Sequence, residues 1–190
     1  MNEVKSNQNM IFEKTKINDV YNILVEKHED QRGFFGRIFD KNEFKKQGLE
    51  SEFVQSSISS SVKKGTLRGI HYQVAPNSEN KLIRCIKGKA FTVIIDLRKN
   101  SSTFGQWDGF EISADNYAMR YIPKGCANGT QILEDNTELF YLTTGFYSNE
   151  CERGVMWNDP FFNINWPLKI TEISNKDKNW KPFDHNTCLT

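Results

Sequence analysis

Short runs of β-forming residues, separated by turn signals, follow one another along almost the whole chain. This alternation predicts an all-β barrel or sandwich. The strands that we expect are Asn22–Lys27, Phe34–Phe39, Phe53–Ser60, Thr66–Gln73, Lys81–Lys87, Ala90–Arg98, Phe110–Ser113, Ala118–Ile122, Gly129–Leu133 and Thr137–Thr143. Within them, Phe91–Leu97 is apolar on nearly both faces, which predicts a strand in the middle of a sheet.

The clearest helical segment is Lys41–Gln47, with Asp40 as its expected N-cap. Phe44 is its apolar anchor, and Gly48 is placed to end it. The tripeptide Lys87-Gly88-Lys89 lies between two expected strands. It predicts a hairpin turn, because glycine readily adopts a positive φ.

The chain is long enough, at 190 residues, to form one domain with a substantial core. No internal repeat, low-complexity stretch or linker divides it. We therefore expect a single domain over residues 1–190, in which residues 1–10 form a flexible N-terminal extension.

Charge and hydropathy exclude several classes of partner. Lys and Arg number 25 against 24 Asp and Glu, a formal net charge of +1. This balance gives no general attraction to nucleic acid or to an acidic membrane, so any phosphate must be bound by a few placed cations. No apolar run approaches the roughly 20 residues of a membrane span, and Met1–Asn9 lacks a signal-peptide core. We expect a soluble, cytoplasmic protein without nucleic-acid or membrane partners.

The cysteines and histidines argue against a metal centre. The cysteines show no CxxC pair and no metal-ligand spacing, so free thiols are expected; they are Cys85, Cys126, Cys151 and Cys188. The three histidines are scattered at His28, His71 and His185. The expected strand around the second reads His-Tyr-Gln, whereas metal-holding barrels usually carry HxH. We therefore predict no metal and no other cofactor, and a centre that works by organic acid–base chemistry.

The segment Gly65–Gln73, GTLRGIHYQ, resembles the RGxHxQ signature of the dTDP-4-dehydrorhamnose 3,5-epimerase family. Nine further blocks match the family in the same order and extend the resemblance over roughly residues 11–183. They are Asp30–Phe35 (DQRGFF), Lys81–Gly88 (KLIRCIKG), Ile95–Arg98 (IDLR), Ser102–Trp107 (STFGQW), Pro123–Gly129 (PKGCANG), Tyr141–Tyr147 (YLTTGFY), Arg153–Asp159 (RGVMWND), Asn165–Leu168 (NWPL) and Ser174–Pro182 (SNKDKNWKP).

The resemblance implies a fold and a reaction. Members of the family are homodimeric β-barrels of the cupin type, jelly rolls with few short helices, and they need no metal. They act on a nucleotide-sugar substrate, inverting C3 and C5 of a dTDP-4-keto-6-deoxyglucose on the route to rhamnose.

Epimerisation beside a ketone needs a base, a group that stabilises the enolate oxygen, and an acid on the opposite face. The resemblance assigns the base to His71, oriented by Asp177, and the acid to Tyr141. It places Lys81 near the sugar ketone, where an ammonium would stabilise the enolate. Outside these motifs, His71 would be read as a hydrogen-bonded core histidine, Lys81 as a solvated lysine and Tyr141 as core packing.

Arg68 and Arg32 are the expected diphosphate ligands, because a guanidinium fork suits phosphate oxygens. An alternating strand would put Arg68 and His71 on opposite faces, since they are three residues apart. Either Gly69 introduces a bulge, or one of the two contacts is made through another part of the dimer.

Further binding residues follow from the resemblance alone. Gln73 and Tyr147 fall in the family's pocket. Phe35 and Phe34 are candidates for stacking on the nucleotide base, with core packing as the alternative.

Three positions depart from the family. Asn128 stands where a second histidine is usual, and Thr92 where an aspartate is usual; we expect these two to be neighbours. Arg37 replaces a glutamate near the nucleotide. Asn128 can exchange hydrogen bonds but cannot titrate, so we expect an epimerase with altered substrate or narrower regiochemistry, with Asn128 and Arg37 still in the substrate site.

Other functions remain possible on the sequence. A 3,4-ketoisomerase also passes through an enol or enolate, although its known enzymes carry different motifs. A sugar-nucleotide-binding barrel without catalysis is disfavoured because His71, Lys81 and Tyr141 are all present. A metal-dependent cupin dioxygenase is disfavoured for want of histidines.

Overall fold

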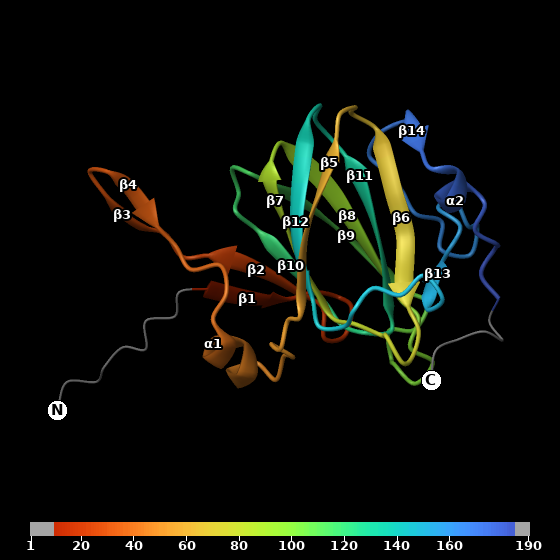
Figure 1. The fold of residues 1–190 in the computed structure, drawn as a ribbon, viewed down its shortest axis with the longest axis horizontal. Helices are drawn as coiled ribbons and strands as arrows, with labels where there is room; N and C mark the ends of the chain where they lie inside the picture. The colour runs from red at the N-terminus through yellow and green to blue at the C-terminus, as the bar shows by residue number, and fades with distance from the viewer. Residues whose placement is uncertain (1–9, 185–190) are drawn as a thin grey trace.

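Two antiparallel sheets face each other in the computed structural model, which describes residues 10–184 (Figure 1). The first sheet has the order β1 (Met10–Lys14), β2 (Tyr21–Val25), β10 (Met119–Ile122), β7 (Lys81–Lys87), β12 (Thr137–Thr143) and β5 (Gln55–Ser61). The second has the order β13 (Glu152–Gly154), β6 (Thr66–Gln73), β11 (Cys126–Ile132), β8 (Lys89–Asp96) and β9 (Trp107–Ser113). A short strand, β14 (Glu172–Ile173), pairs with β6 in parallel.

Aliphatic side chains from both sheets meet between them. Ile83 and Leu139 of the first sheet pack with Ile94, Ile112 and others of the second, all nearly inaccessible to solvent. Burial of this apolar surface is the main force that closes the two sheets on each other. The all-β prediction is confirmed. The central position of β8, which lies between β11 and β9, also matches its apolar sequence.

Three of the expected strands have the predicted ends. The strands β6, β7 and β12 begin and end at the predicted residues. The predicted strand Phe34–Phe39 is wrong for the residues after Phe35. Only β4 (Gly33–Phe35) forms there, and Phe39 instead packs edge-on against Phe44 and Phe53.

Met10, expected to end a flexible extension, instead lies in a strand. Met10 begins β1 and is 1% exposed, because it packs in a second apolar cluster with Phe44 and Tyr121. Residues 1–9, His185 and Cys188 lie outside the described residues. No helix within residues 10–184 is long and apolar enough to cross a membrane.

The glycine turn at Gly88 adopts the expected positive φ of +73°, but it does not make a hairpin. Its flanking strands, β7 and β8, belong to different sheets. The turn is therefore a corner at which the chain crosses from one sheet to the other, as in a jelly roll.

Helix α1 (Lys41–Lys46) forms as the sequence predicts. The Asp40 side chain accepts hydrogen bonds from the Asn42 and Glu43 N–H groups, Phe44 is buried, and Gly48 follows with φ +73°. A single helical turn, α2 (Asn175–Lys178), was not predicted. It is capped by Ser174, whose Oγ accepts from Asp177 N at 3.1 Å.

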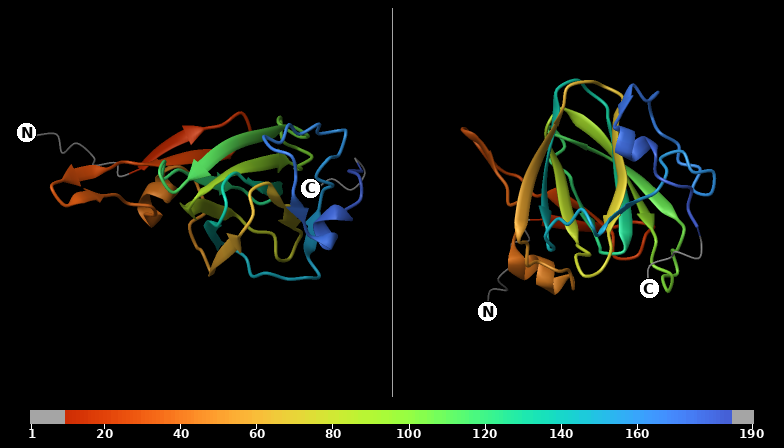
Figure 2. Two further views of the ribbon diagram at one scale, coloured as in Figure 1. Left: turned by 90° about the horizontal axis from the view of Figure 1, so that it is seen from above. Right: turned by 45° about the vertical axis from the view of Figure 1, so that its right-hand side comes forward.

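The hairpin of β3 (His28–Asp30) and β4 extends away from both sheets, as all views in Figures 1 and 2 show. Phe35 is 61% exposed and Phe34 41% exposed. The Phe34 ring packs edge-on against Tyr117 of its own chain.

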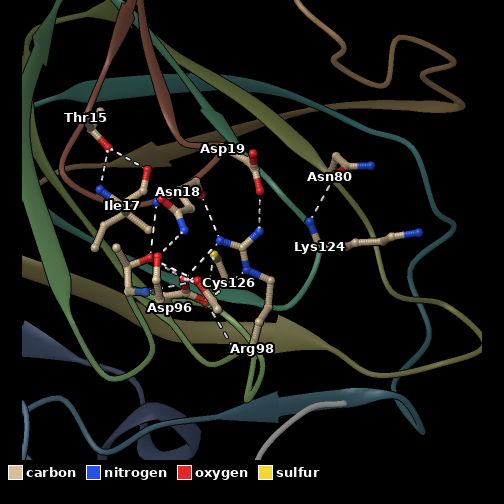
Figure 3. Close-up of polar contacts among 12 residues, drawn as sticks. Thr15, Ile17, Asn18, Asp19, Asn80, Asp96, Arg98, Lys124 and Cys126 are labelled. Atoms are coloured by element: carbon tan, nitrogen blue, oxygen red, sulfur yellow. Dashed lines mark hydrogen bonds and ion pairs between the residues drawn. The ribbon is translucent and has the colours of Figure 1, made fainter.

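A buried carboxylate fastens the N-terminal segment to the end of β8 (Figure 3). Asp96 is fully buried and accepts hydrogen bonds from the Arg98 guanidinium, Ser101 and Thr103. Burial alone would raise the pKa of Asp96, but these hydrogen bonds outweigh it and hold the pKa below its usual value. Arg98 in turn binds Asp19 at 2.8 Å, so one ion network joins the β1–β2 loop to the second sheet.

Candidate active site

A cavity of about 130 Å³ opens between the two sheets. One wall carries Arg68 and His71 from β6 with Asn128 from β11. The opposite wall carries Lys81 from β7 and Tyr141 from β12. The fold thus brings together, around one small space, five of the residues that the sequence singled out.

A β-bulge in β6 explains how Arg68 and His71 share a wall. Opposite β11, Asn128 pairs with His71 and Thr130 pairs with Arg68, so two residues of β6 face only one of β11. Gly69, one of the two, has φ +102°, and a Cβ there would lie 2.7 Å from the Asn128 carbonyl oxygen. The bulge, which is the first of the two alternatives raised by the sequence, therefore depends on glycine.

His71 and Asp177 form a hydrogen-bonded pair at the cavity wall. His71 Nε2 donates to Asp177 Oδ1 at 2.5 Å, and the Gly69 N–H donates to Asp177 Oδ2 at 3.1 Å. Burial alone would raise the pKa of Asp177, but the bonds from His71 and Gly69 outweigh it and hold the pKa below its usual value. The carboxylate therefore keeps the ring proton on Nε2, which leaves Nδ1 unprotonated and available as a base.

The parallel strand β14 brings Asp177 to this position. Glu172 pairs with Thr66 and Ile173 with Leu67, so the C-terminal segment runs alongside β6 in the same direction. Ser174 then caps the single turn α2, and Asp177 lies within it, 4% exposed. His71 and Asp177 are 106 residues apart in sequence. The two-residue strand β14 and the single turn α2 are enough to bring them into contact.

Lys81 lies on the opposite wall and is paired with a buried carboxylate. Its Nζ is 3.0 Å from Glu79 Oε1, and the Glu79 side chain is only 7% exposed. Tyr141 is in the adjacent strand, with Ile83 as its register partner on β7. The tyrosine hydroxyl and the imidazole are therefore carried by facing sheets.

Arg68 is partly engaged by its own chain. Its Nε donates to Ser61 Oγ at 2.9 Å and its NH2 to the Ser60 carbonyl at 2.7 Å. These contacts from β5 orient the guanidinium beside the cavity.

Tyr147 belongs to a charged cluster beside the His71–Asp177 pair. Its hydroxyl donates to Glu152 Oε2 at 2.9 Å, and Lys176 Nζ lies 2.8 Å from Glu152 Oε1. Burial alone would raise the pKa of Glu152, but hydrogen bonds from Lys176 and Tyr147 outweigh it and lower that pKa. Glu152 and Lys176 were not predicted from the sequence, although Lys176 immediately precedes Asp177 and Glu152 immediately precedes a matching block.

Gln73, expected to bind substrate, is bonded to groups of its own chain. It is 5% exposed, and its amide nitrogen donates to Glu79 Oε2 at 2.6 Å and to the Asn77 carbonyl at 3.0 Å. Its amide oxygen accepts from Ser148 N at 2.7 Å. These internal bonds use the polar atoms that a substrate would need, so Gln73 supports the site from behind.

The hairpin residues do not reach the cavity of their own chain. Arg32 lies at the hairpin turn with its side chain 90% exposed and pairs with Asp30. Phe35 belongs to the same hairpin, as a residue of β4. Arg37 pairs with Asp40 at 2.9 Å, so it braces the N-terminus of α1 in its own chain.

Asn128 and Thr92 are neighbours, as expected. The register pairs Thr92 with Thr130, so Asn128 is the diagonal neighbour of Thr92 on the same face. The sequence analysis missed the charged pair behind them. Arg120, which is fully buried, lies 2.5 Å from Asp108 Oδ2 and donates to the Thr92 carbonyl at 3.3 Å.

The part of the chain that the structure describes holds no group of three or more His, Cys, Asp or Glu side chains that could bind a metal ion. Cys85, Cys126 and Cys151 are buried free thiols. Burial raises the pKa of Cys126 to about 12, which makes this thiol a poor nucleophile.

Comparison with known proteins identifies the family. A model described as dTDP-4-dehydrorhamnose 3,5-epimerase matches residues 14–185. The enzyme of that name from Shigella flexneri is 43% identical over 171 residues, 90% of this chain and 94% of the relative. The crystal structure of the epimerase from Elizabethkingia anophelis NUHP1 superposes with a TM-score of 0.90 at 35% identity, over 95% of this chain and 100% of that one.

A second solved structure carries a ligand. It is a dTDP-6-deoxy-D-glucose-3,5-epimerase from Legionella pneumophila Philadelphia 1, in complex with dTDP-4-keto-L-rhamnose. Its TM-score is 0.85 at 35% identity, over 91% of this chain and 92% of that one. The chain belongs to the dTDP-4-dehydrorhamnose 3,5-epimerase family, whose members are isomerases with a cupin-type jelly-roll fold.

Proposed function

We propose that this chain epimerises a nucleotide-linked 4-keto-6-deoxyhexose in deoxysugar biosynthesis, by moving protons at carbons beside the ketone. The observation that carries the proposal is the position of a histidine–aspartate pair and a tyrosine on facing walls of one small cavity. Inversion of a carbon requires removal of a proton from one face and its return on the other, so two proton-transfer groups must flank the ring.

Each group has a role in this scheme. His71 Nδ1 takes the proton from carbon while Asp177 stabilises the imidazolium that forms. The ammonium of Lys81 faces the enolate oxygen and stabilises its charge in a site shielded from water. Tyr141 returns a proton from the opposite face. Asn128 holds a sugar hydroxyl, and the Arg68 guanidinium binds the diphosphate.

We further propose a homodimer in which the hairpin of one copy reaches the cavity of the other. Arg32 and Phe35 lie in the β3–β4 hairpin, which projects from the sheets, and both are largely exposed. A second copy would cover the apolar face of Phe35 and bring Arg32 to the diphosphate. The nucleotide base would then lie between this hairpin and Tyr147.

The test is incubation of the protein with dTDP-4-keto-6-deoxyglucose in deuterium oxide, followed by NMR. Deuterium at C3, C5 or both supports the proposal, and movement of the ketone would instead indicate a 3,4-ketoisomerase. The His71→Ala variant should lose exchange by about a hundred- to ten-thousand-fold while it retains nucleotide binding. Near-normal exchange in that variant would remove the mechanism.

The dimer is tested by mixing variants. Arg32→Ala and His71→Ala should each be impaired, but heterodimers formed by mixing them contain one cavity with both residues intact. Recovery of exchange on mixing supports the shared site. A monomer by light scattering, with full activity, would contradict it.

A further inference from the structure

Lys81 is more enclosed than Arg68, the other cation that lines the cavity, and it is paired with a carboxylate. The Lys81 side chain is 20% exposed, and Glu79 beside it is 7% exposed. A charged pair with so little access to water is costly unless its geometry is well fixed and the remaining oxygen is bonded. The structure supplies both conditions.

The second oxygen of Glu79 is held from behind. Gln73 Nε2 donates to Glu79 Oε2 at 2.6 Å, which leaves Oε1 for the ammonium. Gln73 is itself fixed, since its nitrogen also donates to the Phe146 carbonyl at 3.2 Å and its oxygen accepts from Ser148 N at 2.7 Å. A chain of contacts therefore runs from the 146–148 loop to the Lys81 ammonium.

The backbone between the two charges is also anchored. Asn80 is 8% exposed, and its Oδ1 accepts from the Lys124 N–H at 3.0 Å (Figure 3). Its own N–H donates to Thr144 Oγ1 at 2.9 Å, and its carbonyl accepts from Thr144 N at 3.1 Å. The segment that carries Glu79 and Lys81 is thus bonded to two neighbouring loops, so the carboxylate is a rigid support.

We propose that Glu79 is a positioning residue, held by Gln73, that fixes the Lys81 ammonium at the place where the enolate oxygen develops. A lysine has a flexible four-carbon stem and no geometric preference of its own. Without a partner its ammonium would sample several positions, and catalysis by a preorganised charge would be lost. The inference rests on the proposed role of Lys81 in proton exchange.

The same contacts link this ammonium to the nucleotide end of the site. Gln73 bonds the loop that contains Tyr147, which is the proposed stacking residue. Ordering of that loop by the nucleotide would therefore tighten the support of Glu79. By this route, binding of the nucleotide, which does not react, would increase the rate of proton exchange at the sugar.

The first test is Glu79→Gln, which keeps the size of the side chain and an acceptor for Gln73 but removes the charge facing Lys81. We expect kcat for solvent deuterium exchange to fall about tenfold to a hundredfold, with KM changed less than about threefold, because a small misplacement affects the transition state more than binding. The matched control is Glu138→Gln, which removes the carboxylate of β12 that pairs with Lys87, at 3.7 Å and at the other end of β7 from Lys81, and should leave both constants unchanged. Glu79→Asp retains the charge on a shorter side chain, so its kcat should lie between those of wild type and Glu79→Gln. This variant replaces Glu79→Gln in the test if Glu79→Gln does not fold.

A double-mutant cycle separates positioning from a general structural effect. In a Lys81→Met background, Glu79→Gln should cause no further loss of exchange, since the residue acts only through the ammonium. Additive losses, or wild-type kcat in Glu79→Gln, would overturn the proposal while leaving the epimerase function intact.

A readout without substrate distinguishes this failure from failure of the proposed function. The Lys81 ammonium should give a slowly exchanging ¹⁵Nζ signal in the NMR spectrum of wild type that disappears in Glu79→Gln. Persistence of that signal in the variant would refute the positioning role, whatever the wild type does with the sugar nucleotide.

Discussion

Asp177→Asn is expected to impair exchange more than the small change in size suggests. In the native site, Asp177 accepts two hydrogen bonds, from Gly69 N at 3.1 Å and from His71 Nε2 at 2.5 Å. An amide has one acceptor and one donor group. Because the Gly69 N–H is fixed in the bulge and requires an acceptor, the amide oxygen must face Gly69 and the NH₂ must face His71. Nε2 then has to accept, so the ring proton moves to Nδ1, the nitrogen that should act as base.

The magnitude follows from this loss of the correct tautomer. General base catalysis contributes about 10² to 10⁴ in rate, and the equivalent tautomer error in hydrolase triads costs about 10⁴. We therefore expect exchange to fall by about 10³ to 10⁴ in Asp177→Asn. Asp177→Ala leaves the ring free to choose either tautomer, so it should lose less, about 10².

Deuterium incorporation measures the rates, and ¹⁵N chemical shifts of the His71 ring report which nitrogen carries the proton. The reasoning is refuted if Asp177→Asn keeps more than about a tenth of the wild-type rate. It is equally refuted if the ring in that variant retains its proton on Nε2.

Three further changes test other parts of the site and the fold. Arg68→Ala and Arg32→Ala should each weaken binding of the free nucleoside diphosphate about tenfold or more by calorimetry, because charge-assisted bonds are lost; unchanged affinity in both would place the diphosphate elsewhere. Asn128→His combined with Thr92→Asp should speed the slower of the C3 and C5 exchanges more than either change alone, since diagonal neighbours couple; equal C3 and C5 rates in wild type would end the regiochemical interpretation. Asp96→Asn should lower the free energy of unfolding by about 3 kcal/mol at pH 7, because it breaks a buried ion pair. The pKa of Asp96 is lowered in the folded state, so its contribution to the free energy of unfolding is present above the unfolded pKa of about 4 and is lost as pH falls. The unfolding free energies of wild type and Asp96→Asn should therefore converge in acid. A constant difference between them down to pH 2 would contradict this.

The main strands could be predicted because their side-chain pattern is local. The strands β6, β7 and β12 are seven or eight residues long and are bounded by clear turn signals. The short strands β13 and β14, with three and two residues, exist only because each pairs with β6. Such pairing is a long-range contact, which a local sequence pattern cannot predict.

The same distinction holds for the turn at Gly88. A positive φ is a property of the glycine itself, and it was predicted correctly. Whether the chain then folds back or crosses to another sheet depends on the apolar surface that the next strand must bury.

In the site, residue types were predictable, but apart from Asp177 their partners were not. The motif around His71 indicated a base, and the family resemblance supplied Asp177. Gln73 illustrates why a motif alone does not define a role. A polar residue in a motif can bind the substrate, or it can bind other residues of the protein, as Gln73 binds Glu79. Arg120 was missed because it lies within the otherwise apolar strand β10, where the sequence indicated only core.

The barrel is filled below its cavity. Arg120, which is fully buried, and the aliphatic cluster occupy the interior, and the cavity of about 130 Å³ is well under the roughly 300 Å³ of a drug-sized ligand pocket. A cavity of this size suits one sugar ring, and the proposed scheme accordingly places the nucleotide outside it. In the proposed scheme, recognition of the sugar rests on the cavity strands, and recognition of its carrier rests largely on the projecting hairpin and the loop that contains Tyr147, with Arg68 of β6 at the boundary between them. The sugar-binding residues can change with little change in the nucleotide-binding residues, and the reverse also holds. The same fold can therefore serve different sugars on one nucleotide, or one sugar on different nucleotides.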